Sequence, residues 1–355
     1  MSIVEGLREL LHRRRAATTM VTLAVASLPL CLGAGQQLQH QERVEVARVV
    51  VDTRVIDAQG NPISGLVAAD FRVEADGKPV RVTSVEWVST AASAEHAWPT
   101  GDAQSPPQVF PLPGRLIVFF FQRDLHSSRM RGLMRIVPQI DLLLDSLTRG
   151  DRVAVLSFDS HLKLYADFTN DWRQLRELIR YSIVDYRPPV PADDGPDPSL
   201  AGHFDVERGN DAATPEEGLL VLAEALQPLP GAKTLILFGW GLGKMVSGEV
   251  ITRHQYEPAR RALMAARTTV FSLDFTQADY HSLQGPLRKI AVDTGGFYEK
   301  SFPINAAPFR RLIRAIAGHY VLVFEEPDLP RGRHTISVKL LGRSGRVLAR
   351  HYYYD

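Results

Sequence analysis

A run of six apolar residues, 116–121, constrains the fold of this 355-residue chain more than any other feature. The run is rich in aromatic and β-branched side chains and has no polar alternation, which is typical of a strand buried on both faces of a parallel sheet. Polar residues follow over 122–128, and a helical pattern follows over 129–147. Because α/β sheets place ligand sites at the carboxyl ends of central strands, we expect a functional site in the loop 122–128.

Strand and helix patterns alternate over residues 114–319. Further buried strands are predicted at 152–158, 233–239 and 269–275, with an edge strand at 161–168. Helical spacing is found over residues 171–183, 214–227, 253–267, 282–293 and 307–317. The Pro-, Asp- and Gly-rich stretch 184–213 predicts a long irregular loop. This order predicts an α/β domain with a Rossmann-like, doubly wound, mostly parallel sheet.

The segments on either side of this domain have strand patterns without helices. Residues 45–88 predict roughly four antiparallel strands, with turn signals at 59–62 and at Asp76-Gly77. Residues 320–355 predict about three more, at 320–324, 334–341 and 347–354. Together they have the strand number of a small immunoglobulin-like sandwich. Residues 89–113 are rich in Ala, Ser and Pro, which indicates a linker.

Residues 1–35 have the pattern of a secretory signal peptide. Four arginines precede an apolar run over 16–32, and the small residues Gly33, Ala34 and Gly35 follow it. We therefore expect the protein to be exported, either to a periplasm or as a secreted protein. The alternative is a membrane anchor formed by residues 16–34, although the run is short for a membrane span and contains Pro29.

Composition excludes several classes of function. The 41 basic and 40 acidic residues give a net charge of +1, so no nucleic-acid partner is indicated. Cys31 is the single cysteine, which excludes an intrachain disulfide and a thiolate metal site. We expect contact with a membrane only through the N-terminal segment, if that segment is not cleaved.

Several segments resemble a known family. The apolar strand with its polar loop, the sequence GDRVAV at 150–155 and the later Thr214 are similar to a von Willebrand factor type A (VWFA) domain. The segments GLVAADFRVEADGKPVRV, AVDTGGFYEKS and GHYVLVFEEP resemble the bacterial VWFA-related family of acidobacterial type. This resemblance implies an exported protein with a Rossmann-like sheet and flanking β segments. Complete members have a metal-ion-dependent adhesion site with an Asp-x-Ser-x-Ser loop, a Thr and a later Asp, which together bind Mg²⁺.

This sequence departs from that metal-binding pattern. The loop provides either Asp124-x-His126-x-Ser128 or Gln122-x-Asp124-x-His126, and Thr214 is a plausible match for the Thr. Trp240 stands where the later Asp is expected. Arg123 adds a positive charge in the same loop, which opposes cation binding. We therefore expect a degenerate site with no cofactor; weak Mg²⁺ binding would have to use Asp124, Ser128 and Thr214.

The leading hypothesis is a non-enzymatic module that binds a protein partner and has no catalytic residues. The residues predicted to bind are Gln122, Arg123, Asp124, His126, Ser128, Thr214 and Trp240. Trp240 either anchors the partner or caps the core beneath the loop. A Mg²⁺-dependent adhesion module is the alternative. A hydrolase is a third possibility, but a Ser–His–Asp set within one loop does not have the geometry of a catalytic triad.

Overall fold

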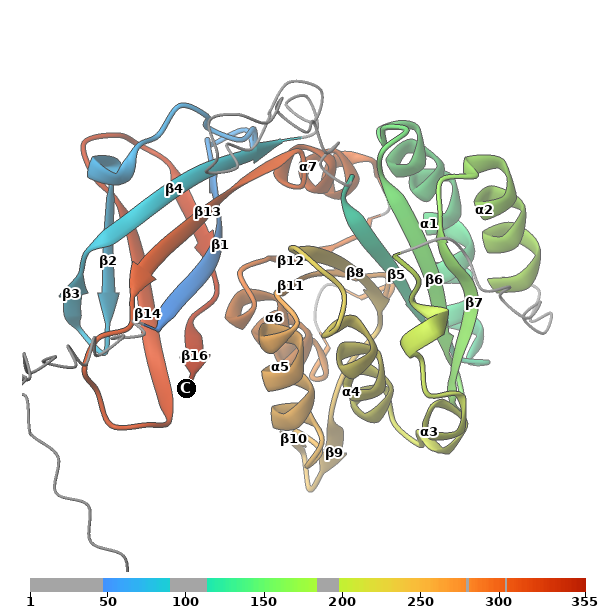
Figure 1. Ribbon diagram of the computed structural model, residues 1–355. Coiled ribbons are helices and arrows are strands. Elements are labelled where there is room, and N and C mark those ends of the chain that lie inside the picture. Colours follow the sequence, from blue (N-terminus) through green and yellow to red (C-terminus); the bar gives the residue numbers. More distant parts are fainter. Residues whose placement is uncertain (1–46, 90–113, 184–197, 279–280, 304) are drawn as a thin grey trace, which may run out of the picture. The chain divides into compact units, whose positions relative to one another are not determined.

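The α/β part is built on a six-stranded sheet in the order β12-β11-β8-β5-β6-β7 (Figure 1). In this computed structural model, the described residues are 47–89, 114–183, 198–278, 281–303 and 305–355. The strands are β5 (Leu116–Gln122), β6 (Arg152–Phe158), β7 (Leu162–Thr169), β8 (Lys233–Gly239), β11 (Thr268–Asp274) and β12 (Tyr298–Lys300). All neighbours are parallel except β7, which is antiparallel to β6 at the edge. The predicted mixed α/β fold with a mostly parallel sheet is confirmed.

Both faces of β5 are buried because its side chains point alternately into two hydrophobic cores. Phe119 and Phe121 belong to one core and Phe120 to the other. The first face is covered by α1 (Ser127–Asp145), α2 (Trp172–Leu178) and α7 (Ala307–Ala315), and the second by α4 (Pro215–Leu226), α5 (Tyr256–Ala265) and α6 (Gln284–Asp293). Each buried Phe stabilises the fold by about 2 kcal/mol. Non-alternating apolar character in β5 therefore follows from its central position.

A small hairpin that the sequence analysis did not predict follows β8. It consists of β9 (Lys244–Val246) and β10 (Glu249–Ile251), which pair antiparallel. Ser247 and Gly248 form its turn with φ angles of 51° and 87°. Two consecutive positive φ values are those of a tight hairpin turn, and Gly adopts them without strain.

The predicted loop 184–213 is partly helical. A 3₁₀ turn at Ala201–His203 and the short helix α3 (Val206–Asp211) lie in its second half. The α3 helix forms because Asp205 accepts a hydrogen bond from the Arg208 amide and caps its first turn. Residues 184–197 of that loop, the predicted signal peptide at 1–35 and most of the predicted linker at 89–113 lie outside the described residues. Within the described ranges, no helix is long and apolar enough to span a membrane.

The remaining strands form two four-stranded antiparallel sheets, β15-β1-β13-β4 and β16-β14-β2-β3. They are β1 (Arg48–Ile56), β2 (Phe71–Ala75), β3 (Lys78–Val80), β4 (Val82–Ser89), β13 (Gly318–Glu325), β14 (Arg333–Leu340), β15 (Arg346–Ala349) and β16 (Tyr352–Tyr354). Strand β13 lies between β1 and β4, and β14 pairs with β2. Segments from the two ends of the described chain therefore share both sheets. Their classification as an immunoglobulin-like sandwich remains a prediction.

The single strand predicted at 347–354 is wrong in one respect, because the chain forms two strands there. Strand β15 pairs with β1 in one sheet, whereas β16 pairs with β14 in the other. Between them, Arg350 forms an isolated bridge with Thr294, and the His351 amide donates to the Asp293 carbonyl. These contacts with the end of α6 draw the chain out of the first sheet.

The β strands also contact the amino-terminal end of β11 through polar side chains. Arg267, just before β11, donates to both carboxylate oxygens of Asp52 on β1, at 2.6 and 3.0 Å. Arg54, also on β1, donates to the Thr269 hydroxyl at 3.0 Å. His319 on β13 lies near the same carboxylate, with its Nε2 3.7 Å from Asp52 Oδ1.

Substitution of Tyr320 can test whether the two ends of the described chain stabilise each other. Its buried hydroxyl donates to the Ile63 carbonyl at 2.8 Å and accepts from the Leu66 amide at 3.0 Å. We expect Tyr320→Phe to lower the free energy of unfolding by about 1–3 kcal/mol in urea denaturation, because it leaves buried backbone groups unpaired. Tyr353→Phe is the matched control, since the buried Tyr353 hydroxyl has no hydrogen-bond partner among the described residues. Equal stability of the two variants would contradict this role.

The low pKa of His319 predicts that the folded protein loses stability in acid. Burial and the Arg54 charge lower the pKa of His319 to about 4. Because the unfolded chain takes up that proton near pH 6.5, stability should fall as the pH drops from about 6.5 to 4, by up to about 3 kcal/mol. Urea denaturation across this range should show a smaller loss for His319→Gln. Parallel pH profiles for the two proteins would refute the assignment.

Candidate functional site

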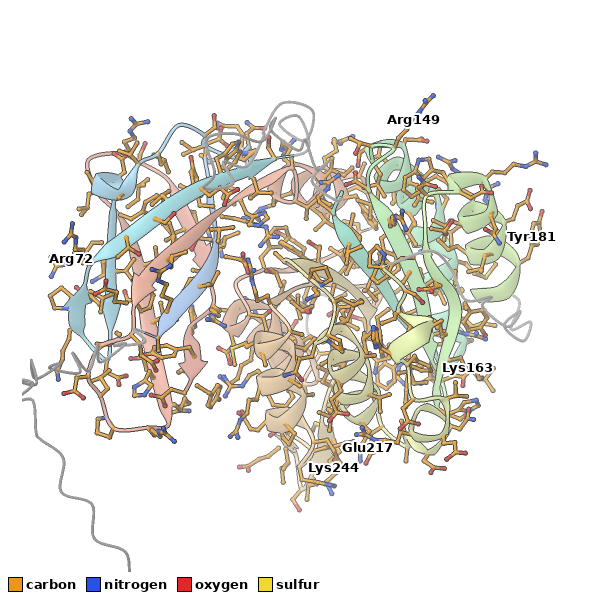
Figure 2. The ribbon with its side chains drawn as sticks, viewed as in Figure 1. Arg72, Arg149, Lys163, Tyr181, Glu217 and Lys244 are labelled. Carbon is orange, nitrogen blue, oxygen red and sulfur yellow. The ribbon has the colours of Figure 1, made fainter. Side chains whose placement is uncertain are left out.

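A cavity of about 570 Å³ lies at the carboxyl edge of the sheet, where the sequence predicted a site. Its walls are formed by the loops after β5, β6 and β8 and by the first turn of α4. Figure 2 labels Lys163, Glu217 and Lys244 at this end of the α/β part and Arg149 at the opposite end. Of the predicted site residues, the structure brings Gln122, Arg123, Asp124 and Trp240 to this cavity.

Gln122 is the last residue of β5, and its side chain forms hydrogen bonds with the loop after β8. Its side chain is buried, and Oε1 accepts from the Trp240 and Gly241 amides at 3.0 and 3.2 Å. Its Nε2 donates to the Gly241 carbonyl at 2.7 Å. The Gln122 amide group therefore satisfies the backbone of the loop after β8 and fixes the floor of the cavity.

Arg123 is also buried and belongs to a charged group at the end of β6. Its Nη1 donates to the Tyr165 hydroxyl at 2.9 Å, and its Nη2 lies 4.0 Å from Asp159. Lys163 Nζ donates to both oxygens of Asp159 at 2.9 Å. Burial acts to raise the pKa of Asp159, but hydrogen bonds from Lys163 and Ser160 outweigh it and hold that pKa below its ordinary value. This wall of the cavity therefore contains fixed charges of both signs.

Asp124, His126 and Ser128 shape the loop and the start of α1. Asp124 accepts from the His126 amide at 2.7 Å and forms an ion pair with Arg129. His126 Nδ1 lies 2.9 Å from the Ser128 hydroxyl. His126 and Ser128 do not line the cavity. Their polar side-chain atoms form hydrogen bonds within the loop and at the start of α1.

Trp240 is half-buried between the hydrophobic core and Arg129. Its ring packs against the core that covers the α1 face of the sheet. The Arg129 guanidinium lies over the ring, 3.4 Å from its centroid, in a cation–π arrangement. Because Asp124 pairs with the same guanidinium, Arg129 links the loop after β5 to the loop after β8.

Thr214 caps α4 beside the cavity but does not line it. Its hydroxyl accepts from the Glu217 amide at 3.2 Å, and the Glu217 carboxylate accepts from the Thr214 amide at 3.1 Å. This reciprocal pair is a capping box. The next residue but one, Glu216, is buried and accepts from the Gly243 amide at 2.5 Å, with Arg253 3.7 Å away.

Several residues that line the cavity were not among the predicted site residues, and Leu125, Asp159 and Glu216 are three of them. Leu125 is 77% exposed at its rim, whereas Asp159 and Glu216 form part of its walls. Asp159 directly follows β6, so the rule that pointed to the loop after β5 could have identified it. Glu216 had no such signal, because an acidic residue in the first turn of a helix is an ordinary feature.

Asp274, at the carboxyl end of β11, was not among the predicted residues and does not line the cavity. It is fully buried and accepts from Tyr298 at 2.6 Å and from the Thr276 hydroxyl at 2.6 Å, with His281 Nε2 at 2.5 Å. Burial acts to raise the pKa of Asp274, but these hydrogen bonds outweigh it and keep that pKa low. The following loop returns to the site, because the Leu242 amide donates to the Leu283 carbonyl.

Gln122 provides a direct test of how the cavity floor is held. We expect Gln122→Ala to cost about 2 kcal/mol or more, because the buried Gly241 N–H and C=O groups lose their partner. Amide exchange should accelerate at Trp240 and Gly241, and urea denaturation should report the loss. Gln59→Ala, at an exposed turn, is the control. If both variants behave alike, Gln122 does not hold this loop.

Comparisons with known proteins give only distant likenesses. No protein-family model and no curated protein match this chain. Human COPII-coat protein Sec24c is 14% identical over 68% of this chain, with a TM-score of 0.38, and the match spans 43% of that chain. A von Willebrand factor type A protein from Catenulispora acidiphila is 13% identical, with 82% of this chain and 74% of that chain covered and a TM-score of 0.40. The manganese-loaded Plasmodium vivax TRAP protein is 12% identical, with coverages of 76% and 96% and a TM-score of 0.34. At these scores, the likenesses support no statement about what this chain binds.

Proposed function

We propose that this chain is an exported, non-enzymatic VWFA-like module that binds a protein partner through the loops at the carboxyl edge of its sheet. The observation that carries this proposal is the cavity of about 570 Å³ whose rim exposes Leu125 above a hydrogen-bonded floor. Protein interfaces have an apolar core that is surrounded by a polar, solvent-accessible rim. Export rests on residues 1–35 and is proposed with the same function.

The surface around the cavity has more exposed apolar side chains than Leu125 alone. Met245, Val246 and Ile251 on the β9–β10 hairpin are 47%, 38% and 45% exposed. The hairpin joins the cavity directly, because Gly243 precedes β9 and lines the wall. Single exposed apolar residues are common, whereas a group beside a cavity favours an interaction surface.

We assign two kinds of role to the predicted binding residues. Asp124 and Trp240 line the cavity and are proposed to contact the partner, with Asp124 steering it at the rim. The other five predicted residues are proposed to act by shaping the surface: Gln122, the buried Arg123, His126, Ser128 and Thr214.

Binding is proposed to be independent of metal, through a degenerate metal-ion-dependent adhesion site. A hard cation needs free carboxylate and hydroxyl oxygens. Asp124 is paired with Arg129, the Thr214 hydroxyl caps α4, and the buried Arg123 lines the same cavity. Among the described residues, no group of three or more His, Cys, Asp or Glu side chains could hold a metal ion. The Mg²⁺-dependent alternative requires Asp124 to leave Arg129 and join Ser128 and Thr214.

A hydrolase is disfavoured by the geometry of the loop. The contact between His126 Nδ1 and the Ser128 hydroxyl, at 2.9 Å, is the feature that could suggest one. Asp124 accepts from the backbone amide of His126 at 2.7 Å. A catalytic histidine needs an acid that orients its ring, and in this loop the acid is used to fix the backbone.

The proposal predicts that an exposed leucine is a binding anchor. Mature protein used as bait should capture a partner from the exported fraction, and affinity for that partner should fall by about 2 kcal/mol or more in Leu125→Glu. Val67→Glu is the matched control, because Val67 is 60% exposed on the β part of the chain. Equal loss in both variants, or none in either, would contradict the proposed surface.

Two experiments separate the remaining alternatives. Trp240→Ala distinguishes a binding role of Trp240 from a core role, and chelation of metal ions distinguishes metal-independent from Mg²⁺-dependent binding. If Trp240 is an anchor, Trp240→Ala should lower affinity with little change in melting temperature, whereas a core role should lower the melting temperature strongly. We expect capture to persist in EDTA. Binding lost in EDTA and restored by Mg²⁺ would favour the metal-dependent module.

A further inference from the structure

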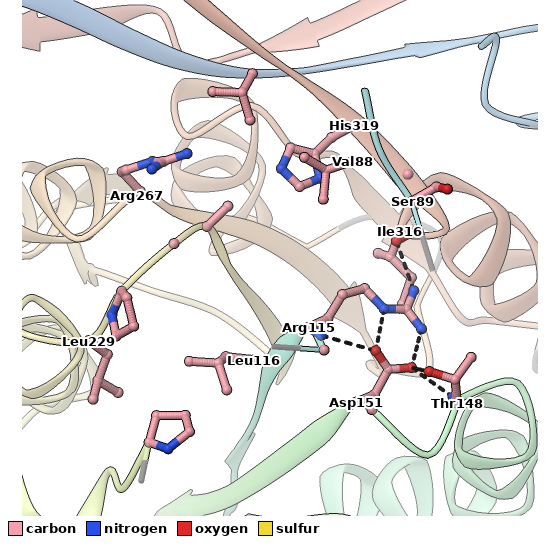
Figure 3. A pocket seen from close by; sticks show the side chains of 18 of the residues that line it. Val88, Ser89, Arg115, Leu116, Thr148, Asp151, Leu229, Arg267, Ile316 and His319 are labelled. Atoms are coloured by element: carbon pink, nitrogen blue, oxygen red, sulfur yellow. Dashed lines mark hydrogen bonds and ion pairs between the residues drawn. The ribbon is translucent and has the colours of Figure 1, made fainter. Parts of the chain in front are cut away.

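A second cavity, of about 900 Å³, lies at the opposite edge of the sheet, where β5, β6 and β8 begin. Its walls are largely apolar and include Leu116, Leu229, Ile316 and Val321 (Figure 3). This volume is within the range of small-molecule sites. The cavity has no part in the function proposed for the carboxyl edge.

Arg267 and His319 are among the polar residues that line this cavity. Figure 3 shows Arg267 on the same side of the view as Leu229, with the His319 ring to its right. Arg267 uses Nε and Nη2 to bind Asp52. Burial and the Arg54 charge lower the pKa of His319 to about 4, so its ring is neutral at pH 7. Arg267 is therefore the charged one of these two residues.

A second arginine on the cavity wall is neutralised by its partner. Arg115 donates to Asp151 through Nε at 2.8 Å and Nη2 at 2.6 Å, and through Nη1 to the Ile316 carbonyl at 2.8 Å (Figure 3). All three of its nitrogens thus have acceptors. Arg267 is also paired with a carboxylate, that of Asp52, but through Nε and Nη2 alone.

Buried positive charge accumulates behind Arg267. Arg54 and Lys233 are 3% and 2% exposed. Lys233 donates to the carbonyls of Leu229 and Ala266, and Arg54 donates to a threonine hydroxyl. Burial lowers the pKa of Arg54 to about 10 and that of Lys233 to about 8, so both remain largely charged at pH 7. These buried cations are hydrogen-bonded to neutral acceptors.

There are fewer acidic side chains than basic ones in this region. Arg350, also largely buried, donates to the carbonyls of Met264 and Val50. Asp52 and the exposed Glu86 are the carboxylates that act on Arg267. Four basic side chains, Arg54, Lys233, Arg267 and Arg350, therefore face two acidic ones. Because buried charge is costly without an opposite charge, the cavity wall at Arg267 favours an anionic group.

We propose that the cavity at the amino edge of the sheet binds a free fatty acid. The alkyl chain would lie against Leu116, Leu229 and Ile316, and the carboxylate would accept hydrogen bonds at Arg267. An apolar body with one anionic end matches a largely apolar cavity that is lined by Arg267, with further basic side chains buried behind that residue.

Isothermal titration with decanoate and the equally long neutral decanol, both below their micellar or solubility limits, tests this proposal. Decanoate should bind at least about tenfold more tightly than decanol, because only its head is charged. Arg267→Gln should remove this preference. Arg173→Gln should retain it, because that arginine is 89% exposed on α2. Equal binding of the two ligands, or none, would overturn the proposal.

Two further variants guard against a folding defect. Asp52→Asn/Arg267→Gln removes both partners of the ion pair together, so it keeps the local net charge and should also lose the preference for decanoate. Ala232→Phe fills the cavity from its wall and should abolish binding of both ligands. Melting temperatures establish that each variant is folded. Undiminished decanoate binding by folded Ala232→Phe would place the ligand elsewhere and refute the site.

Discussion

Two-sided burial of β5 is the constraint on which the rest of the structure depends. Its alternating side chains supply both hydrophobic cores, and the ring of Phe121 stacks on that of Phe238 in β8, with centroids 4.7 Å apart. The next residue, Gln122, ends the same strand and binds the backbone of the loop after β8. The position of the cavity floor therefore follows from the packing of two adjacent central strands. A surface mounted in this way can be rigid even though loops form it.

The β part depends on strands that are distant in the sequence. Strand β13 joins β1 to β4, and the hydroxyl of Tyr320 on β13 binds the loop after β1. The ion pair between Arg267 and Asp52 connects β1 with the start of β11. Stability of the β strands is therefore coupled to that of the α/β sheet through a few buried polar contacts, whose loss should be costly.

The sequence predicted the parts of the fold that local patterns determine. The bounds of β6 and β8 were predicted correctly, because buried strands between turn residues have a clear local signature. The break at Arg350 could not be predicted, since it depends on contacts with Asp293 and Thr294 that the fold brings near. The sequence pattern likewise placed Gln122 at the carboxyl edge of the sheet without revealing that its hydrogen bonds are used by the neighbouring loop. Leu125 was passed over because exposure of one loop leucine cannot be read from its neighbours.

The central claim is that a partner binds at the carboxyl edge of the sheet without a metal ion. Amide hydrogen exchange of the mature chain, alone and with its captured partner in EDTA, tests it most directly. The account predicts that new protection is concentrated in residues 122–128 and 240–251. Protection that appears only with Mg²⁺, or that lies on the β sheets instead, would contradict it.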